Sequence, residues 1–226
     1  MNAEEIINHL KKNGDKNKIE GMARFGIKKE KNLGNSVTYL RKYSKKIGKN
    51  HSLALELWNS GFRDAMMVAA CIEDPKNISE KQMDEWVLDF DSWDICDHVC
   101  GHLFDKTPFS YKKAYVWSSR KEEFVKRAGF ALIAWLAVHD KKADDIKFED
   151  FLNIIIKEST DERNYVKKSV NWALRNIGKK NKNLNKKAIE TAEKIKKIDS
   201  KSSKWIANDA LRELKSDKIK KRIEKK

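Results

Sequence analysis

The run Ala128-Gly129-Phe130-Ala131-Leu132-Ile133-Ala134-Trp135-Leu136-Ala137-Val138 contains no charged residue. A helix of this composition has no polar face, so it must be buried on nearly all sides. The run is much shorter than the roughly 20 apolar residues that span a bilayer, and no longer apolar stretch occurs elsewhere in the chain. The run therefore predicts a helix at the centre of a stack of other helices.

The rest of the chain is also patterned as helix. Apolar residues recur at steps of three and four, only nine glycines and two prolines interrupt 226 residues, and no run alternates with a period of two. Helix starts are expected at Thr107-Pro108 and at two capping boxes, Ser79 to Gln82 and Ser119 to Glu122. Helix ends are expected at Gly14, Gly48 and Gly178. The expected helices are 3–12, 35–47, 51–58, 61–72, 79–87, 91–104, 108–116, 119–138, 148–158, 162–177, 185–197 and 200–214, with a charged tail from about 217.

These short helices are separated by short polar turns and by no long linker. This organisation predicts one all-α domain over residues 1–226, built as an α-solenoid of antiparallel helix pairs. A compact bundle without repeats is the alternative, because no sequence period is strict enough to prove repeats.

Charge is distributed unevenly along the chain. The formal net charge is +15, which favours a polyanionic partner, although 40 lysines against nine arginines also point to a compositional lysine bias. Residues 1–50 carry a net charge of +8, residues 51–110 carry −8, and residues 161–226 alone carry +13. We expect a polyanion to be held by the two basic ends, chiefly by the C-terminal third.

Other classes of protein are disfavoured. The N-terminus has no apolar signal-peptide core, so a cytoplasmic protein is expected. Three cysteines without a disulfide pattern are expected to be buried free thiols. Cys96, His98, Cys100 and His102 resemble metal ligands, but on one helix the two cysteines and the two histidines point in nearly opposite directions. No metal and no cofactor are therefore expected.

One helix carries an aromatic residue on its polar face. In the helix near 162–177, Trp172 points about 130° away from the apolar stripe, on a face that it shares with Tyr165, Lys168 and Arg175. Aromatic side chains stack on sugars and bases, and Lys and Arg bind phosphates, so this face suits nucleic acid. The alternative is that a neighbouring helix covers Trp172.

A second candidate group lies near the middle of the chain. Trp93 and Asp97 are one helical turn apart on the flank of an apolar stripe, where the indole lowers the local dielectric constant and strengthens the carboxylate charge. Alternatively, Asp97 caps a helix or pairs with a lysine. Arg127 directly precedes the uncharged run and must reach a surface or pair with an acid such as Glu123 or Asp97.

Several stretches in the same order resemble one family, the DNA alkylation repair family of HEAT-like repeat alkylpurine DNA glycosylases. The likeness runs from Met22-Ala23-Arg24-Phe25-Gly26-Ile27 to about residue 214. It includes Leu57-Trp58-Asn59-Ser60-Gly61, Gln82-Met83-Asp84-Glu85-Trp86-Val87, Ser92-Trp93-Asp94, Glu122-Glu123-Phe124-Val125-Lys126-Arg127-Ala128, Asn171-Trp172-Ala173-Leu174-Arg175 and Asp209-Ala210-Leu211-Arg212.

The resemblance implies a C-shaped superhelix, here a monomer, whose basic concave face holds duplex DNA containing cationic purines such as 3-methyladenine and 7-methylguanine. It implies a catalytic set of Asp97, Trp93, Trp172 and Arg127, with Lys126 as the adjacent alternative for the arginine. The residues expected to contact DNA are Lys126, Lys168, Arg175, Tyr165 and Arg24. The base would be released without being flipped into a pocket. Two other readings stay open: a relative without catalytic activity that binds bent or branched DNA, and a solenoid that binds proteins.

Overall fold

The computed structural model describes residues 1–224, and within that range every regular element is a helix. The all-α prediction is therefore confirmed. The chain divides into two units, residues 1–108 (unit 1) and residues 109–226 (unit 2). Unit 1 contains α1 (Ala3–Lys12), α2 (Lys16–Ala23), α3 (Val37–Ile47), α4 (His51–Asn59), α5 (Arg63–Ile72), α6 (Glu80–Leu88), α7 (Trp93–His102) and the 3-10 helix η1 (Phe104–Lys106). Unit 2 contains α8 (Ser110–Ser118), α9 (Glu123–His139), α10 (Asp145–Glu158), α11 (Asn164–Gly178), α12 (Lys182–Lys196), α13 (Lys201–Leu214) and α14 (Asp217–Glu224).

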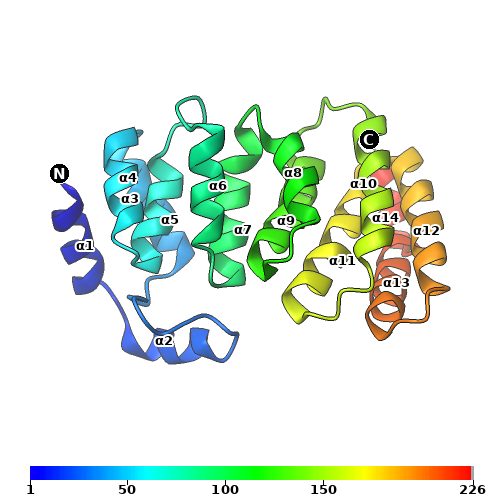
Figure 1. Cartoon of the computed structure of the whole chain (residues 1–226), viewed down its shortest axis with the longest axis horizontal. Helices are drawn as coiled ribbons and strands as arrows, with labels where there is room; N and C mark the ends of the chain where they lie inside the picture. The colour runs from blue at the N-terminus through cyan, green and yellow to red at the C-terminus, as the bar shows by residue number, and fades with distance from the viewer. Residues whose placement is uncertain (225–226) are drawn as a thin grey trace. The chain divides into compact units, whose positions relative to one another are not determined.

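In unit 1, helices stack side by side in a fixed register (Figure 1). Arg63 Nε on α5 donates to Asp94 Oδ2 on α7 over 2.7 Å, and the Met67 carbonyl lies 3.1 Å from His98 Nε2. Both contacts join residues 31 positions apart, so α5 and α7 run parallel as successive copies of one element.

Unit 2 repeats this arrangement with a longer period. Asn171 Nδ2 on α11 donates to Asp209 Oδ2 on α13 over 2.7 Å, and Arg175 Nη1 donates to Glu213 Oε2 over 2.8 Å. Both pairs are 38 positions apart. Stacking of parallel helices at a constant offset, each joined to the next by an intervening antiparallel helix, is the arrangement of an α-solenoid, so the solenoid prediction is confirmed. The C-shaped outline stays a prediction.

The observed helix boundaries test the capping residues and helix ends predicted from the sequence. Ser79 caps α6, because its Oγ accepts from the Gln82 backbone N–H over 3.0 Å, but the reciprocal half of the predicted capping box is replaced by a hydrogen bond from the Gln82 side chain to Glu73. Gly48 ends α3 with a φ of 79°, as predicted. The capping box at Ser119 is wrong: Ser119 ends α8, and α9 begins four residues later at Glu123. The chain also forms α2, which the sequence pattern missed, and α14, where only a charged tail was expected.

The uncharged run lies in α9 and is mostly buried, with Phe130, Leu132 and Ile133 completely inaccessible. A Cβ on Gly129 would lie 2.3 Å from the Ser118 backbone nitrogen, so only glycine allows α8 and α9 to approach this closely. Burial is incomplete, because Trp135 is half-buried within the run. Among the described residues, no helix is long and apolar enough to cross a bilayer.

Candidate functional site

In unit 1 the candidate site is carried by the first turns of α7. Ser92 Oγ donates to Asp94 Oδ1 over 2.8 Å, and the buried Asp94 carboxylate pairs with the buried Arg63 guanidinium at 2.5 Å. This network fixes the start of α7 against α5. It also leaves Trp93 and Asp97, one turn apart, as half-buried residues on the same flank of the helix.

The Trp93 ring is held in place from outside α7. Its Nε1–H donates to the Phe25 carbonyl oxygen over 2.9 Å. Phe25 belongs to the turn that follows α2, where Gly26 adopts a φ of 79°, and its side chain is 70% exposed. Arg24 is exposed in the same turn. One hydrogen bond thus joins the candidate tryptophan to a turn that displays an aromatic ring and a cation to solvent.

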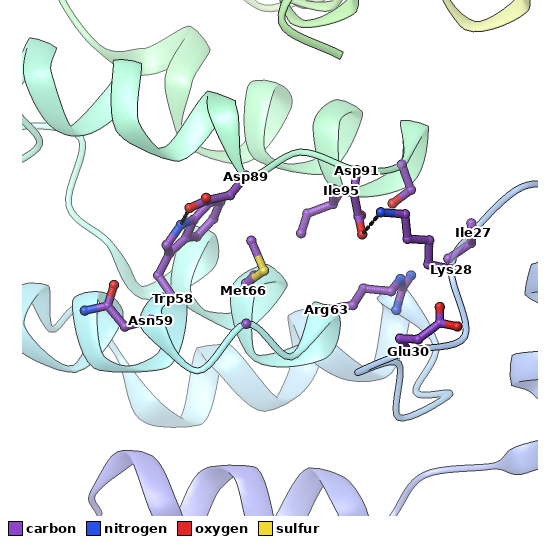
Figure 2. Close-up of a pocket in the computed structure, with 12 residues that line it drawn as sticks. Ile27, Lys28, Glu30, Trp58, Asn59, Arg63, Met66, Asp89, Asp91 and Ile95 are labelled. Atoms are coloured by element: carbon purple, nitrogen blue, oxygen red, sulfur yellow. Dashed lines mark hydrogen bonds and ion pairs between the residues drawn. The ribbon is translucent and has the colours of Figure 1, made fainter. Parts of the chain in front are cut away.

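The segment after this turn closes one side of a cavity of about 390 Å³ (Figure 2). Lys28 pairs with Asp91 at 3.4 Å across its mouth, and Trp58 Nε1 donates to Asp89 over 2.7 Å. The lining mixes cations and carboxylates, so the cavity has no strong preference for anions. The Lys28–Asp91 pair holds the segment that follows the Phe25 turn against the loop before α7.

In unit 2, Trp172 lies half-buried on α11 and meets Trp135 of α9. The two rings are perpendicular with their centroids 5.4 Å apart, and Trp135 also stacks on His139 at 4.9 Å. Edge-to-face packing of this kind fixes ring orientation and contributes about 0.5–1.5 kcal/mol beyond area burial. A neighbouring helix therefore covers Trp172 only in part.

The adjacent cations Lys126 and Arg127 have different surroundings. Arg127 is 6% exposed, and its Nη1 donates to the Tyr165 carbonyl oxygen over 2.6 Å, which joins α9 to the start of α11. Lys126 Nζ lies 2.6 Å from Glu158 and 3.3 Å from Asp161. The charge of Lys126 is therefore largely balanced by two acids of its own unit.

The remaining predicted DNA contacts also differ from one another. Arg175 pairs with Glu213 at 2.8 Å and with Asp209 at 3.3 Å, so α13 supplies acids to this part of α11. The half-buried ring of Tyr165 packs against Phe124, with centroids 5.5 Å apart. Lys168 is exposed.

The structure thus places the predicted residues in two groups. Trp93, Asp97 and Arg24 belong to unit 1. There Trp93 donates a hydrogen bond to the carbonyl of Phe25, the neighbour of Arg24. The group in unit 2 comprises Lys126, Arg127, Tyr165, Lys168, Trp172 and Arg175.

The sequence pattern did not indicate two residues that contact the candidate tryptophans: Trp135, which packs against Trp172, and Phe25, whose carbonyl accepts from Trp93. Trp135 lies within the uncharged run 128–138, and such a run predicts only a buried core helix. Phe25 gave one usable signal, since it is an aromatic residue between an arginine and a glycine in a basic stretch.

Cys96, His98 and Cys100 of α7 are buried in the core, whereas His102 is half-buried. His98 is buried, and the loss of hydration together with the nearby His102 lowers its pKa to about 3. Burial also raises the pKa of the Cys100 thiol. Cys96 and Cys100 are buried as predicted, whereas Cys71 is half-buried. Among the described residues, no group of three or more His, Cys, Asp or Glu side chains could hold a metal ion.

The stacked helix pairs make this chain a helical-repeat protein. Residues 6–214 match the model of the DNA alkylation repair enzyme family. The chain belongs to this family.

Solved structures agree on the fold. One is described as belonging to "a new family of proteins related to the HEAT-like repeat DNA glycosylases with affinity for branched DNA structures". It superimposes with a TM-score of 0.79 at 23% identity, over 95% of this chain and 96% of that one. A designed armadillo repeat protein has 16% identity over 79% of this chain and 92% of its own, with a TM-score of 0.37. No curated protein sequence matches the chain.

Proposed function

We propose that this protein is a monofunctional DNA glycosylase that hydrolyses the N-glycosidic bond of cationic alkylated purines in duplex DNA. The observation that carries the proposal is the pair on α7: a half-buried carboxylate, Asp97, one turn from an indole, Trp93, that is fixed by a hydrogen bond to the Phe25 carbonyl. Membership of a family of DNA alkylation repair enzymes supports the choice of substrate.

The chemistry suits a site with one carboxylate. Most glycoside hydrolases need one carboxyl group to protonate the leaving group and a second to attack or to activate water. An alkylated purine such as 3-methyladenine or 7-methylguanine already carries a positive charge, so it departs as a neutral base without a general acid. The remaining tasks are to stabilise the positive charge that develops on the sugar and to direct water to it.

Asp97 is assigned both tasks. Its carboxylate stabilises the oxocarbenium-like sugar electrostatically and accepts a proton from the attacking water. Trp93 supports this role because its ring excludes water from one side of the carboxylate and lowers the local dielectric constant.

Trp172 and Arg127 are assigned to binding. The face of Trp172 would bind DNA as part of unit 2, and a cation over an indole contributes about 0.5–2 kcal/mol. Trp135 orients Trp172 through the perpendicular ring contact at 5.4 Å. Arg127 would hold a phosphate of the DNA backbone, oriented by its hydrogen bond to the Tyr165 carbonyl.

The surrounding cations have unequal roles in this proposal. Lys168 and Arg24 are exposed and would contact phosphates, with the Tyr165 ring beside the strand. Lys126 and Arg175 are each paired with two carboxylates, so their contribution to DNA affinity would be smaller than their charge suggests.

The direct test is release of 7-methylguanine and 3-methyladenine from methylated duplex DNA. We expect the wild type to release both bases and to leave an abasic site without strand cleavage. Failure of the wild type to release any of several cationic lesions would overturn the proposal.

A second function, binding of branched DNA without catalysis, is favoured by one comparison. The structure that superimposes over 95% of this chain is described as having affinity for branched DNA. Gel shifts with a four-way junction and a linear duplex, run beside the base-release assay, separate the two functions. Preference for the junction without base release would support the second function.

A further inference from the structure

Unit 1 contains a second cavity, at the opposite end of α7 from Trp93. Its volume is about 260 Å³, and it lies among the C-terminal ends of α3, α5 and α7. Trp93 is the first residue of α7 and His102 the last, so His102 lies about 14 Å along the helix from Trp93 and about 8 Å from Asp97. Its lining consists of Arg41, Ser44, Lys45, Gly48, Lys49, Cys71, His102 and Lys106.

The lining contains four permanent cations and no carboxylate. Lys49 Nζ donates to the carbonyl oxygens of Cys71 and Glu73 over 3.0 and 2.6 Å. Lys106 Nζ donates to the His102 carbonyl over 2.6 Å. These two lysines cap helix ends, but a carbonyl carries no net charge, so their positive charge still acts on the cavity.

Arg41 and Lys45 complete the cationic rim. They lie one turn apart on α3, and both are exposed. Like charges at this spacing repel each other and destabilise an isolated helix, so Arg41 and Lys45 lie close together at a cost to the stability of α3. An anion between them would offset the repulsion.

Two other cavities of the described residues differ from this one in charge. The cavity of about 390 Å³ described above includes the carboxylates of Glu30, Asp89 and Asp91 in its lining. A cavity of about 690 Å³ in unit 2 includes Asp145, and one of its lysines, Lys179, pairs with Glu213. Neither offers an anion a purely cationic lining.

We propose that the cavity bounded by Arg41, Lys45, Lys49 and Lys106 binds a phosphate of the DNA backbone. Arg41 and Lys45 would donate to the phosphate oxygens, while the two capping lysines supply a fixed positive field. The site rests on the DNA binding proposed above and not on the glycosylase reaction. It gives unit 1 a contact with DNA that is independent of Asp97.

Charge-loss variants of α3 provide the first test, with a matched control on the same helix. R41A/K45A removes the two rim cations, whereas K42A/K46A removes the same charge from exposed positions outside the lining. Loss of one phosphate contact should lower affinity for unmethylated duplex about eightfold at ~0.1 M salt and reduce the slope of log K against log salt by about 0.9. K42A/K46A should change this slope by less than half as much. Equal changes in the two variants would overturn the site.

Cys71 allows the site to be observed directly, because it lines the cavity while Cys96 and Cys100 are completely buried. N-ethylmaleimide should add once to the native wild type and not at all to C71S. Unmethylated duplex should slow this addition about elevenfold at a concentration ten times its Kd, following the factor 1 + [L]/Kd. R41A/K45A should lose most of the protection.

The source of the phosphate is tested by competition with a free anion. Pyrophosphate at the same total phosphate concentration should protect Cys71 far less than duplex does. Equal protection by pyrophosphate would assign the cavity to a small phosphate compound and overturn the DNA assignment, and absence of any protection by duplex would overturn the site. Protection by duplex in a protein that releases no base would leave the site standing while the glycosylase proposal fails.

Discussion

The substitution Asp97→Asn separates catalysis from binding more sharply than any other. It removes the charge of the carboxylate and keeps its shape, so the half-buried position on α7 stays filled. Glycosidic bond cleavage places positive charge on the sugar, and a neutral amide cannot offset that charge or accept a proton from water. We expect base release to fall and the fold to be retained.

The size of the loss follows from the exposure of the side chain. A partly buried charge interacts through an effective dielectric constant of about 20, so a carboxylate about 4 Å from a developing cation stabilises it by about 4 kcal/mol. This energy corresponds to about a thousandfold in rate. Affinity for DNA should stay equal or rise, because the formal net charge increases by one from +15.

Single-turnover release of 7-methylguanine, with duplex binding measured by fluorescence anisotropy, tests both expectations. Glu85→Gln is the matched control, since it makes the same charge change on α6, where Glu85 forms an exposed ion pair with Lys81. The control should keep nearly the full rate. A rate for Asp97→Asn within about tenfold of the wild type, or a rate loss fully explained by weaker binding, would refute the assignment of Asp97.

Three further outcomes follow from the same contacts. Trp93→Phe keeps an aromatic ring but loses the hydrogen bond to the Phe25 carbonyl, so single-turnover release should slow by about 2- to 13-fold, the equivalent of 0.5–1.5 kcal/mol; an unchanged rate would show that the bond does not position the ring. Lys126→Ala leaves the carboxylates of Glu158 and Asp161 close together without their shared cation, so urea denaturation should show a loss of stability larger than any change in DNA affinity; the opposite pattern would make Lys126 a phosphate contact. His98 has a folded pKa of about 3 against an ordinary 6.5, so its contribution to stability is complete above about pH 6.5 and is lost as pH falls toward 3, at up to about 1.4 kcal/mol per pH unit; His98→Gln should flatten this part of the stability profile, and an identical slope would exclude His98 as its cause.

The sequence predicted most helices because helical periodicity and caps are local signals. Ser79 and Gly48 act within one turn of themselves, and the structure confirms both. Prediction from the sequence failed where tertiary contacts determine the helix boundary. Ser119 has the spacing of a capping residue, yet α9 begins at Glu123 instead. There α8 and α9 pack closely at Gly129, a tertiary contact that the local spacing does not show.

The sequence does not show the structural repeat, because the repeat consists of contacts between equivalent positions and not of repeated residues. The offset of 31 residues appears in Arg63 with Asp94, and the offset of 38 appears in Asn171 with Asp209. Different residue types perform the equivalent contacts and the period changes along the chain, so no pattern of identical residues marks it. The candidate residues Trp93, Asp97 and Trp172 were accessible to sequence reasoning because a polar or aromatic residue on the wrong face of a helix is itself a local anomaly.

Net charge is a less direct guide to DNA binding than the pairing of each cation. The C-terminal third has the largest positive charge in the sequence, but Arg175 and Lys179 share Glu213, so part of that charge is balanced within the unit. In the basic N-terminal block, Arg41 and Lys45 line a cavity that no carboxylate enters. Counterion release depends on cations that meet phosphates, and a cation already paired with a carboxylate gains less from that exchange. We therefore expect the salt dependence of DNA binding to respond more strongly to the loss of Arg41 and Lys45 than to the loss of Arg175, contrary to the order that regional net charge predicts.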